Sequence, residues 1–151
     1  MIAVVQRVST ASVSIEETTV ARIGSGLVAL VGVANEDTVQ DARALGRKIA
    51  DLRVFADDQG LLNLSVAETE GQVLLVSQFT LLGEVRRGRR PSFVAAAPPA
   101  VAAPMIEAVV DVIAEIGVPV STGIFGAHMT VALVNDGPVT LIVRTASGRV
   151  T

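Results

Sequence analysis

The segment Val73–Gly83 constrains this chain most, because an unbroken apolar run there passes directly into polar side chains. Val73–Val76 is wholly apolar, a pattern typical of a strand that is covered on both faces. Ser77, Gln78 and Thr80 then place two hydroxyls and an amide near the end of that strand. Such groups either hydrogen-bond to neighbouring backbone or face a ligand where a rigid strand opens into a loop. The residues that follow favour a ligand site.

A compact cationic loop follows Gly83. It holds four arginines within five residues: Arg86, Arg87, Arg89 and Arg90. Seen alone, such a loop is more often solvated surface than an RNA site. Clustered guanidinium groups repel one another, however, and each suits bidentate contact with phosphate. Because the net charge of the chain is −3, the loop is a local cationic feature, and both interpretations remain open.

Composition narrows the possible classes of protein. The length of 151 residues fits one domain, 1–151, and we find no repeat or linker. Half of the residues are hydrophobic, and this excess predicts a subunit interface, because so small a monomer hides its apolar surface with difficulty. No apolar run approaches the roughly 18 residues of a membrane helix. The first residues lack the shape of a signal peptide, so we expect a cytoplasmic protein without membrane contact.

Catalytic chemistry is limited by the absence of cysteine and by a single histidine, His128. Thiolate nucleophiles, disulfides and zinc–thiolate sites are excluded. No spacing of ligands typical of catalytic zinc is present, so we expect no metal and no cofactor. His128 follows a glycine turn and has no acidic residue at a suggestive spacing, which disfavours a Ser-His-Asp arrangement.

Hydrophobic spacing predicts two main helices. The first, Thr38–Leu52, begins at a capping box formed by Thr38 and Asp41. The second is predicted over Pro104–Ile116, because the prolines before it argue against one longer helix. Its apolar residues at helical spacing predict an inward face of Met105, Ala108, Val109, Val112 and Ile116.

Short apolar runs bounded by turn residues predict the strands. They are Ile2–Val8, Val13–Ile15, Val20–Ile23, Leu27–Val33, Val54–Phe55, Leu61–Val66, Val73–Val76, Val118–Thr122, Met129–Val134 and Val139–Arg144. Asn135–Pro138 is predicted to be a tight turn, and the tail from Thr145 to be irregular. These elements predict an α+β fold, one domain with an antiparallel or mixed, barrel-like sheet and two main helices.

Gly137-Pro138 allows two interpretations. After Asn-Asp, a Gly-Pro pair is common at the turn of a hairpin. A cis proline would instead form a rigid type VI turn whose carbonyl groups could recognise an ammonium.

Several segments together resemble the D-aminoacyl-tRNA deacylase family, over essentially the whole chain and in the same order. They are Ala3–Val8, Ser77–Leu81, Gly88–Phe93, Gly126–Met129 and Asn135–Thr140. Position 128 departs from the family pattern, in which an acidic or polar residue is more usual than histidine.

The resemblance implies a homodimeric hydrolase that cleaves the ester between a D-amino acid and the 3′ end of tRNA. It implies that tRNA, and not DNA, is the partner, and that glycyl-tRNA mischarged on tRNA(Ala) is also accepted. Gly137-Pro138 is expected to be cis and to reach into the other subunit's pocket, where it rejects L-amino acids, with Arg7 holding the motif. The substrate pocket is expected to be formed by Ser77, Gln78, Phe79 and Met129.

Ester hydrolysis needs a nucleophile, a stabilised oxyanion and a proton acceptor. Thr80 is the best side-chain nucleophile, although no evident base activates it. Alternatively, backbone N–H groups near Phe79 and Thr80 stabilise the oxyanion while a water attacks, positioned by the 2′-hydroxyl of the substrate; we favour this version. An alternative function is a non-catalytic module that binds RNA ends through the arginine loop.

Overall fold

Two apolar runs of the sequence, Leu27–Val33 and Val73–Val76, lie in neighbouring strands in the middle of the sheet. The computed structural model describes residues 1–86 and 88–151. In it, β3 (Gly26–Gly32) and β6 (Gln72–Ser77) pair in parallel, with Leu30 opposite Val76. The run from Val73 to Val76 is fully buried, as the sequence predicts for a strand covered on both faces.

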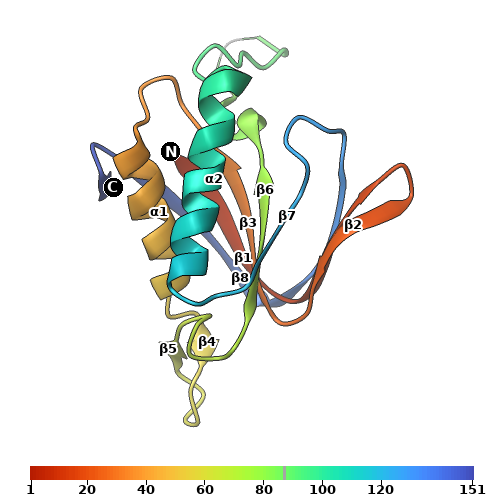
Figure 1. Ribbon diagram of the computed structural model, residues 1–151, viewed down its shortest axis with the longest axis vertical. Helices are drawn as coiled ribbons and strands as arrows, with labels where there is room; N and C mark the ends of the chain where they lie inside the picture. Colours follow the sequence, from red (N-terminus) through yellow and green to blue (C-terminus); the bar gives the residue numbers. More distant parts are fainter. Residues whose placement is uncertain (87) are drawn as a thin grey trace.

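β1 (Ile2–Ile15) organises the rest of the sheet, because it pairs antiparallel with three strands. Its partners are β3, β2 (Thr18–Ile23) and β8 (Thr130–Ala146). The described residues form a seven-stranded sheet in the order β7-β6-β3-β1-β8-β9, with β2 attached to β1. β7 (Val120–Thr122) runs parallel to β6, and β9 (Arg149–Val150) pairs with the end of β8. The sheet is therefore mixed, and in Figure 1 its β2 side curls away to give half a barrel.

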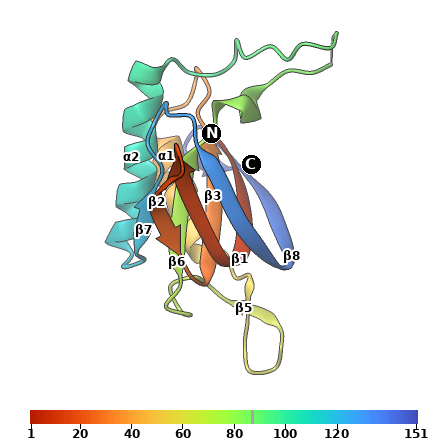
Figure 2. The ribbon, with the colours of Figure 1, turned by 90° about the vertical axis from the view of Figure 1, so that its right-hand side faces the viewer.

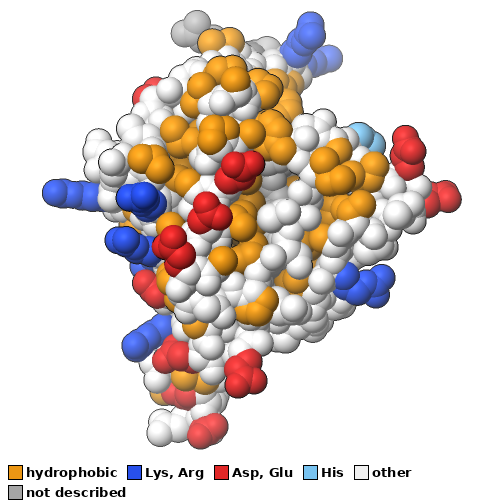
Figure 3. Space-filling model, viewed as in Figure 1, with side chains coloured by type: hydrophobic (Ala, Val, Ile, Leu, Met, Phe, Trp, Pro, Cys, Tyr) orange, Lys and Arg blue, Asp and Glu red, His pale blue; other side chains and the backbone are white. Residues whose placement is uncertain are grey.

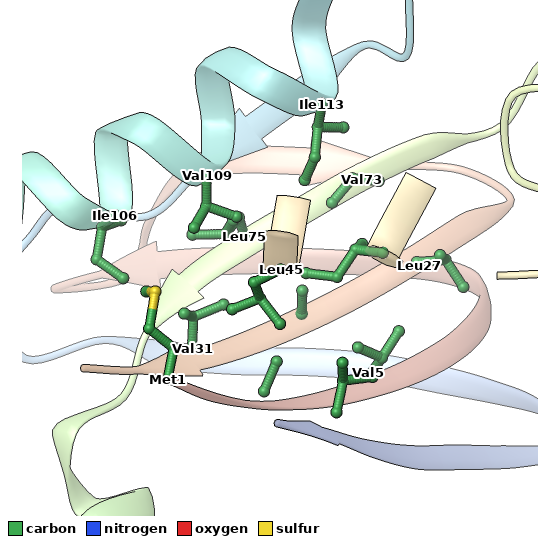
Figure 4. Packing of buried hydrophobic residues seen from close by; sticks show 14 of the residues in the cluster. Met1, Val5, Leu27, Val31, Leu45, Val73, Leu75, Ile106, Val109 and Ile113 are labelled. Carbon is green, nitrogen blue, oxygen red and sulfur yellow. The ribbon is translucent and has the colours of Figure 1, made fainter. Parts of the chain in front are cut away.

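Two helices, α1 (Val39–Asp51) and α2 (Pro99–Glu115), lie side by side on one face of this sheet in the described part of the chain (Figures 1 and 2). They cover a core in which Leu45 of α1 and Val109 of α2 meet Leu27 and Leu75 of the sheet (Figure 4). Thr38 and Asp41 form the predicted capping box at the start of α1. Neither helix is long and apolar enough to cross a membrane.

A smaller core lies on the other face, under the curl of the sheet. Val13 of β1, Ile23 of β2, Val28 of β3 and Val76 of β6 belong to it. Side chains alternate between the two faces along a strand, so the central strands contribute to both cores. This double burial explains why their sequences are continuous apolar runs.

The start of α2 corrects the predicted boundary, because the helix begins at Pro99 and not at Pro104. Pro99 occupies the first helical turn, where its missing N–H has no intrahelical partner to lose. Pro104 lies inside the helix and removes one hydrogen bond near its start. The alanine-rich neighbours of Pro104 favour helix and offset this loss. The predicted inward face is also partly wrong, since Ile106 and Ile113 are buried while Ile116 is 40% exposed.

The prediction of a tight turn at Asn135–Pro138 is wrong, because the chain does not reverse there. β8 pairs with β1 on both sides of this segment, with Val8 opposite Asn135 and Gln6 opposite Thr140. Two steps along β1 thus match five along β8, so the intervening residues form a wide bulge. The tail is also regular, because Thr145 and Ala146 pair with Val150 and Arg149.

Two further predictions concern the strands. β4 (Phe55–Ala56) and β5 (Leu62–Leu64) form the predicted hairpin, although with shorter strands. The gap predicted between Val8 and Val13 is absent from the structure, because β1 continues through it.

Candidate active site

A cavity of about 550 Å³ opens beside the carboxyl ends of the parallel strands β3 and β6. This size suits a small-molecule group, and the carboxyl edge of parallel strands is a common place for ligands. One wall comes from α2, and the opposite wall comes from the segment before β8; Figure 3 shows hydrophobic side chains gathered over both. Its lining includes Val31, Val33, Ser77, Gln78, Phe79, Ala97, Ala102, Ile106, Phe125, His128 and Met129.

The polar residues at the end of β6 lie where the strand becomes a turn of 3-10 helix, η1 (Phe79–Leu82). The backbone N–H of Gln78 donates to the carbonyl oxygen of Val31 at 2.7 Å, which holds the strand end in the sheet. The Gln78 side-chain amide donates to the hydroxyl of Thr80. Thr80 is exposed and lies on η1 beside the cavity, outside the residues that line it.

The start of η1 presents two backbone donors. At the two ends of this turn, the N–H of Leu81 donates to the carbonyl of Gln78 at 3.3 Å, and the N–H of Gly83 donates to the carbonyl of Thr80 at 3.0 Å. The N–H groups of Phe79 and Thr80 precede them and have no acceptor among the described residues. A pair of adjacent backbone N–H groups of this kind is what an oxyanion site requires.

Charged groups are nearly absent from the cavity. His128 is the one titratable residue in the described lining, and it is exposed at the rim. No three His, Asp or Glu side chains come together as a possible metal site in the part of the chain that the structure describes. The cavity therefore offers backbone dipoles, a hydroxyl and an amide, and not a strong general base.

The bulge that contains Gly137 and Pro138 is held by side chains on both of its sides. The peptide bond between Gly137 and Pro138 is cis, and Gly137 has a φ of +139°, a region that only glycine adopts readily. Asn135 acts as a brace across the bulge: its Oδ1 accepts from the N–H of Val139 at 2.9 Å, and its Nδ2 donates to the Val139 carbonyl at 3.1 Å. Arg7 donates from Nε to the carbonyl of Asp136 at 2.9 Å.

Gly137 and Pro138 are exposed and do not line the cavity of their own chain. The structure thus brings Ser77, Gln78, Phe79 and Met129 together and leaves the Gly-Pro motif elsewhere. Sequence reasoning missed the brace made by Asn135. Its signal was the tendency of asparagine to bond to nearby backbone, which gives an irregular segment a substitute for sheet pairing.

The arginine loop is closed at its base by a backbone pair between Glu84 and Ser92, with N–O distances of 2.8 and 3.0 Å. Glu84 also accepts from Arg86, with the Nε of Arg86 2.7 Å from Oε2. These hydrogen bonds from Arg86 lower the pKa of the Glu84 carboxyl. Arg86 therefore already has a carboxylate partner within the loop, a pairing that the charge pattern alone did not reveal.

The other arginines of the loop differ from Arg86. Arg89 and Arg90 are exposed and form no ion pair with any described residue. The predicted contact at Arg87 lies outside the described residues. All three described arginines of the loop are exposed, and Arg89 and Arg90 are those without an ion pair among the described residues.

The chain is similar to known proteins of one family. The sequence model of the family described as D-Tyr-tRNA(Tyr) deacylase matches residues 4–144. The D-aminoacyl-tRNA deacylase of Geobacter sulfurreducens is 54% identical over 147 residues, which cover 97% of each chain. That of Desulforudis audaxviator is 57% identical over 142 residues, covering 94% of this chain and 95% of its own. That of Chloroflexus aurantiacus is 50% identical over 149 residues, covering 99% of this chain and 93% of its own.

Solved structures share the fold. One named c-Myc DNA Unwinding Element Binding Protein is 36% identical, with a TM-score of 0.90 over 97% of this chain and 100% of its own. A probable eukaryotic D-amino acid tRNA deacylase is 18% identical, with a TM-score of 0.79 over 93% of this chain and 97% of its own. At this identity the likeness is one of fold alone. By its family match and by these relatives, the chain belongs to the D-Tyr-tRNA(Tyr) deacylase family.

Proposed function

We propose that this protein is an ester hydrolase that deacylates D-aminoacyl-tRNA, releasing the free D-amino acid and tRNA. One observation carries the proposal: over nearly its whole length the chain is 50–57% identical to proteins named D-aminoacyl-tRNA deacylase. The cavity supports it, because its volume of about 550 Å³ suits the terminal adenosine and its aminoacyl group.

The chemistry that the site supports is attack by water on the ester carbonyl. The N–H groups of Phe79 and Thr80 stabilise the oxyanion of the tetrahedral intermediate. The bond from the carbonyl carbon to the ribose 3′-oxygen then breaks, and a proton from water ends on that oxygen. Since the described lining offers no carboxylate, the 2′-hydroxyl of the substrate positions the water. Thr80 acts as support, because its hydroxyl bonds to the Gln78 amide, which is not a base and cannot activate it.

Selection of the D-enantiomer is assigned to Gly137 and Pro138 of a second subunit. The motif is exposed, held by Arg7 and Asn135, and outside the cavity of its own chain. Its carbonyl groups accept from the substrate ammonium, and its backbone occupies the space that an L side chain would need. Glycyl-tRNA mischarged on tRNA(Ala) is accepted, because glycine has no side chain to reject. The active protein is accordingly a homodimer.

Contact with the tRNA backbone is assigned to the arginine loop. Arg89 and Arg90 are exposed and without ion pairs among the described residues, so they are available to phosphate. Arg86 instead braces the loop through Glu84. Figure 2 shows that the segment between η1 and α2 extends away from the body of the protein, as a contact with a large partner requires.

The alternative is a module that binds the tRNA end without catalysis, and turnover separates the two. The protein is mixed with a tenfold or greater excess of one tRNA charged with a D-amino acid, its L-enantiomer or glycine. We expect hydrolysis of the whole D-aminoacyl and glycyl pools, with the L-aminoacyl ester intact. Protection of a stoichiometric fraction of the D-ester would establish the binding module, and equal hydrolysis of both enantiomers would refute the chiral filter.

A further inference from the structure

Phe93 connects the arginine loop to the edge of the cavity. Its ring meets that of Phe79 edge to face, with ring centroids 5.2 Å apart and an interplanar angle of 72°. Phe79 lines the cavity although its side chain is 57% exposed, so little else surrounds it. Phe93 is half-buried and does not line the cavity. Phe93 therefore contacts a residue of the cavity wall without lining the cavity itself.

The backbone on each side of Phe93 is anchored independently. On one side, Ser92 pairs with Glu84 across the base of the loop. On the other, the Nδ2 of Asn35 donates to the carbonyl of Val94 at 2.8 Å. The carbonyl of Phe93 itself accepts from the N–H of Ala96 at 3.0 Å. These hydrogen bonds fix the backbone that carries the Phe93 ring, although the neighbouring residue, Val94, is 84% exposed.

Phe93 also packs closely on Gly83, the residue directly after η1. A Cβ at Gly83 would lie 2.9 Å from the Cε1 atom of Phe93 and 2.9 Å from the carbonyl oxygen of Thr80. The residue must therefore lack a side chain for the ring to sit there. The ring thus contacts both ends of η1, the turn that presents the N–H groups of Phe79 and Thr80.

We propose that Phe93 is a positioning residue for the deacylation reaction: it holds η1 so that the Phe79 and Thr80 N–H groups stay aimed at the oxyanion. The proposal rests on the proposed function. It separates two roles within one loop. Arg89 and Arg90 bind phosphate and therefore set KM, whereas Phe93 acts through Phe79 and therefore sets kcat.

The experiment compares Phe93→Leu, Phe93→Tyr and the double variant Arg89→Ser/Arg90→Ser with the matched control Val94→Ala. Each is assayed at saturating and limiting D-aminoacyl-tRNA and on D-aminoacyl-adenosine, which lacks the phosphates. Phe93→Leu lowers kcat about threefold to tenfold on both substrates, the range for one edge-to-face pair, and leaves KM unchanged. Phe93→Tyr restores kcat because it retains the ring, and Val94→Ala has no effect. The arginine variant raises KM for tRNA alone.

Circular dichroism melting of each variant separates positioning from general loss of fold. A Phe93→Leu variant that melts like the wild type and still loses kcat supports the proposal. Unchanged kcat would overturn it, as would a rise in KM alone, which would place Phe93 among the RNA contacts. An equal loss of kcat in Phe93→Leu and Phe93→Tyr would also overturn the proposal. Failure of the wild type to turn over any D-aminoacyl substrate would instead refute the proposed function.

Discussion

Arg7 shows how one side chain holds an irregular piece of backbone in place. Its Nε donates to Asp136 and its Nη1 donates to the carbonyl of Val54, so it joins the bulge of β8 to the segment before β4. The side chain is only 13% exposed, whereas that of Asp136 is 60% exposed. Solvent screens the ion pair between them, so the hydrogen bonds to backbone are the main contribution of Arg7.

Replacing Arg7 by methionine should therefore weaken the bulge without emptying the space its stem occupies. We expect the free energy of unfolding to fall by about 1–3 kcal/mol, the range for hydrogen bonds from a charged group. If the motif lines a partner's pocket, kcat/KM for D-aminoacyl-tRNA should fall at least about tenfold, because small misplacements near the reacting centre are costly. Chemical denaturation and single-turnover assays measure the two effects. Arg144→Met, at an exposed position of β8, is the matched control and should change neither.

At the scale of elements, the start of α1 is tied to the end of the sheet by Asp41. Its side chain is 1% exposed and accepts from Thr38 at the beginning of the helix. Its other oxygen accepts from the N–H of Gly148 at 2.8 Å, in the turn between β8 and β9. Burial raises the pKa of Asp41, but the hydrogen bonds from Gly148 and Thr38 outweigh burial, so the pKa lies below its ordinary value.

Because folding lowers this pKa, the stabilisation by ionised Asp41 is present above the pKa of the unfolded chain and is lost as pH falls through the folded value. Asp41→Asn should lower the free energy of unfolding at neutral pH by about 2–3 kcal/mol, since the amide cannot accept as many hydrogen bonds. The difference between variant and wild type should shrink below about pH 4. Denaturation at several pH values tests this. A gap that stays constant down to acid pH would contradict it, and Asp51→Asn, on the exposed last turn of α1, is the control.

At the scale of the whole molecule, the face of the sheet turned away from the helices is apolar near β8. Val4 lies opposite both Leu30 and Ile142, so these three side chains share that face. Ile142 is 59% exposed, and Val4 and Leu30 beside it are half-buried. Exposed apolar side chains on a sheet face are typical of an interface between proteins.

If a second copy covers this face, a charge on it should separate the subunits. We expect the wild type to sediment as a dimer at micromolar concentration and Ile142→Glu to sediment as a folded monomer. Activity should fall with the dimer, because the proposed chiral filter takes its Gly-Pro motif from the other subunit. Leu61→Glu is the matched control, since Leu61 is equally exposed, at 61%, on the distant β4–β5 hairpin. A wild type that is monomeric and fully active would rule out both the dimer and the shared site.

Sequence alone determined the features that depend on near neighbours. The apolar run at Val73–Val76 is a buried strand because both faces of the sheet are covered, and the capping box of Thr38 and Asp41 starts α1 as predicted. Ser77 and Gln78 stand out in the sequence because polar side chains interrupt an apolar run, and they do line the cavity. In each case the signal lies within a few residues of the feature it predicts.

Only the tertiary structure decided the features that depend on distant contacts. α2 is apolar around most of its circumference, so spacing did not show that Ile106 and Ile113, and not Ile116, would be buried. The segment at Gly137 is a bulge and not a turn because β1 continues past it and pairs on both sides. Phe93 reaches Phe79 because the loop folds back at Glu84 and Ser92. Such contacts join residues far apart in the chain, and local patterning carries no record of which distant surface a residue will meet.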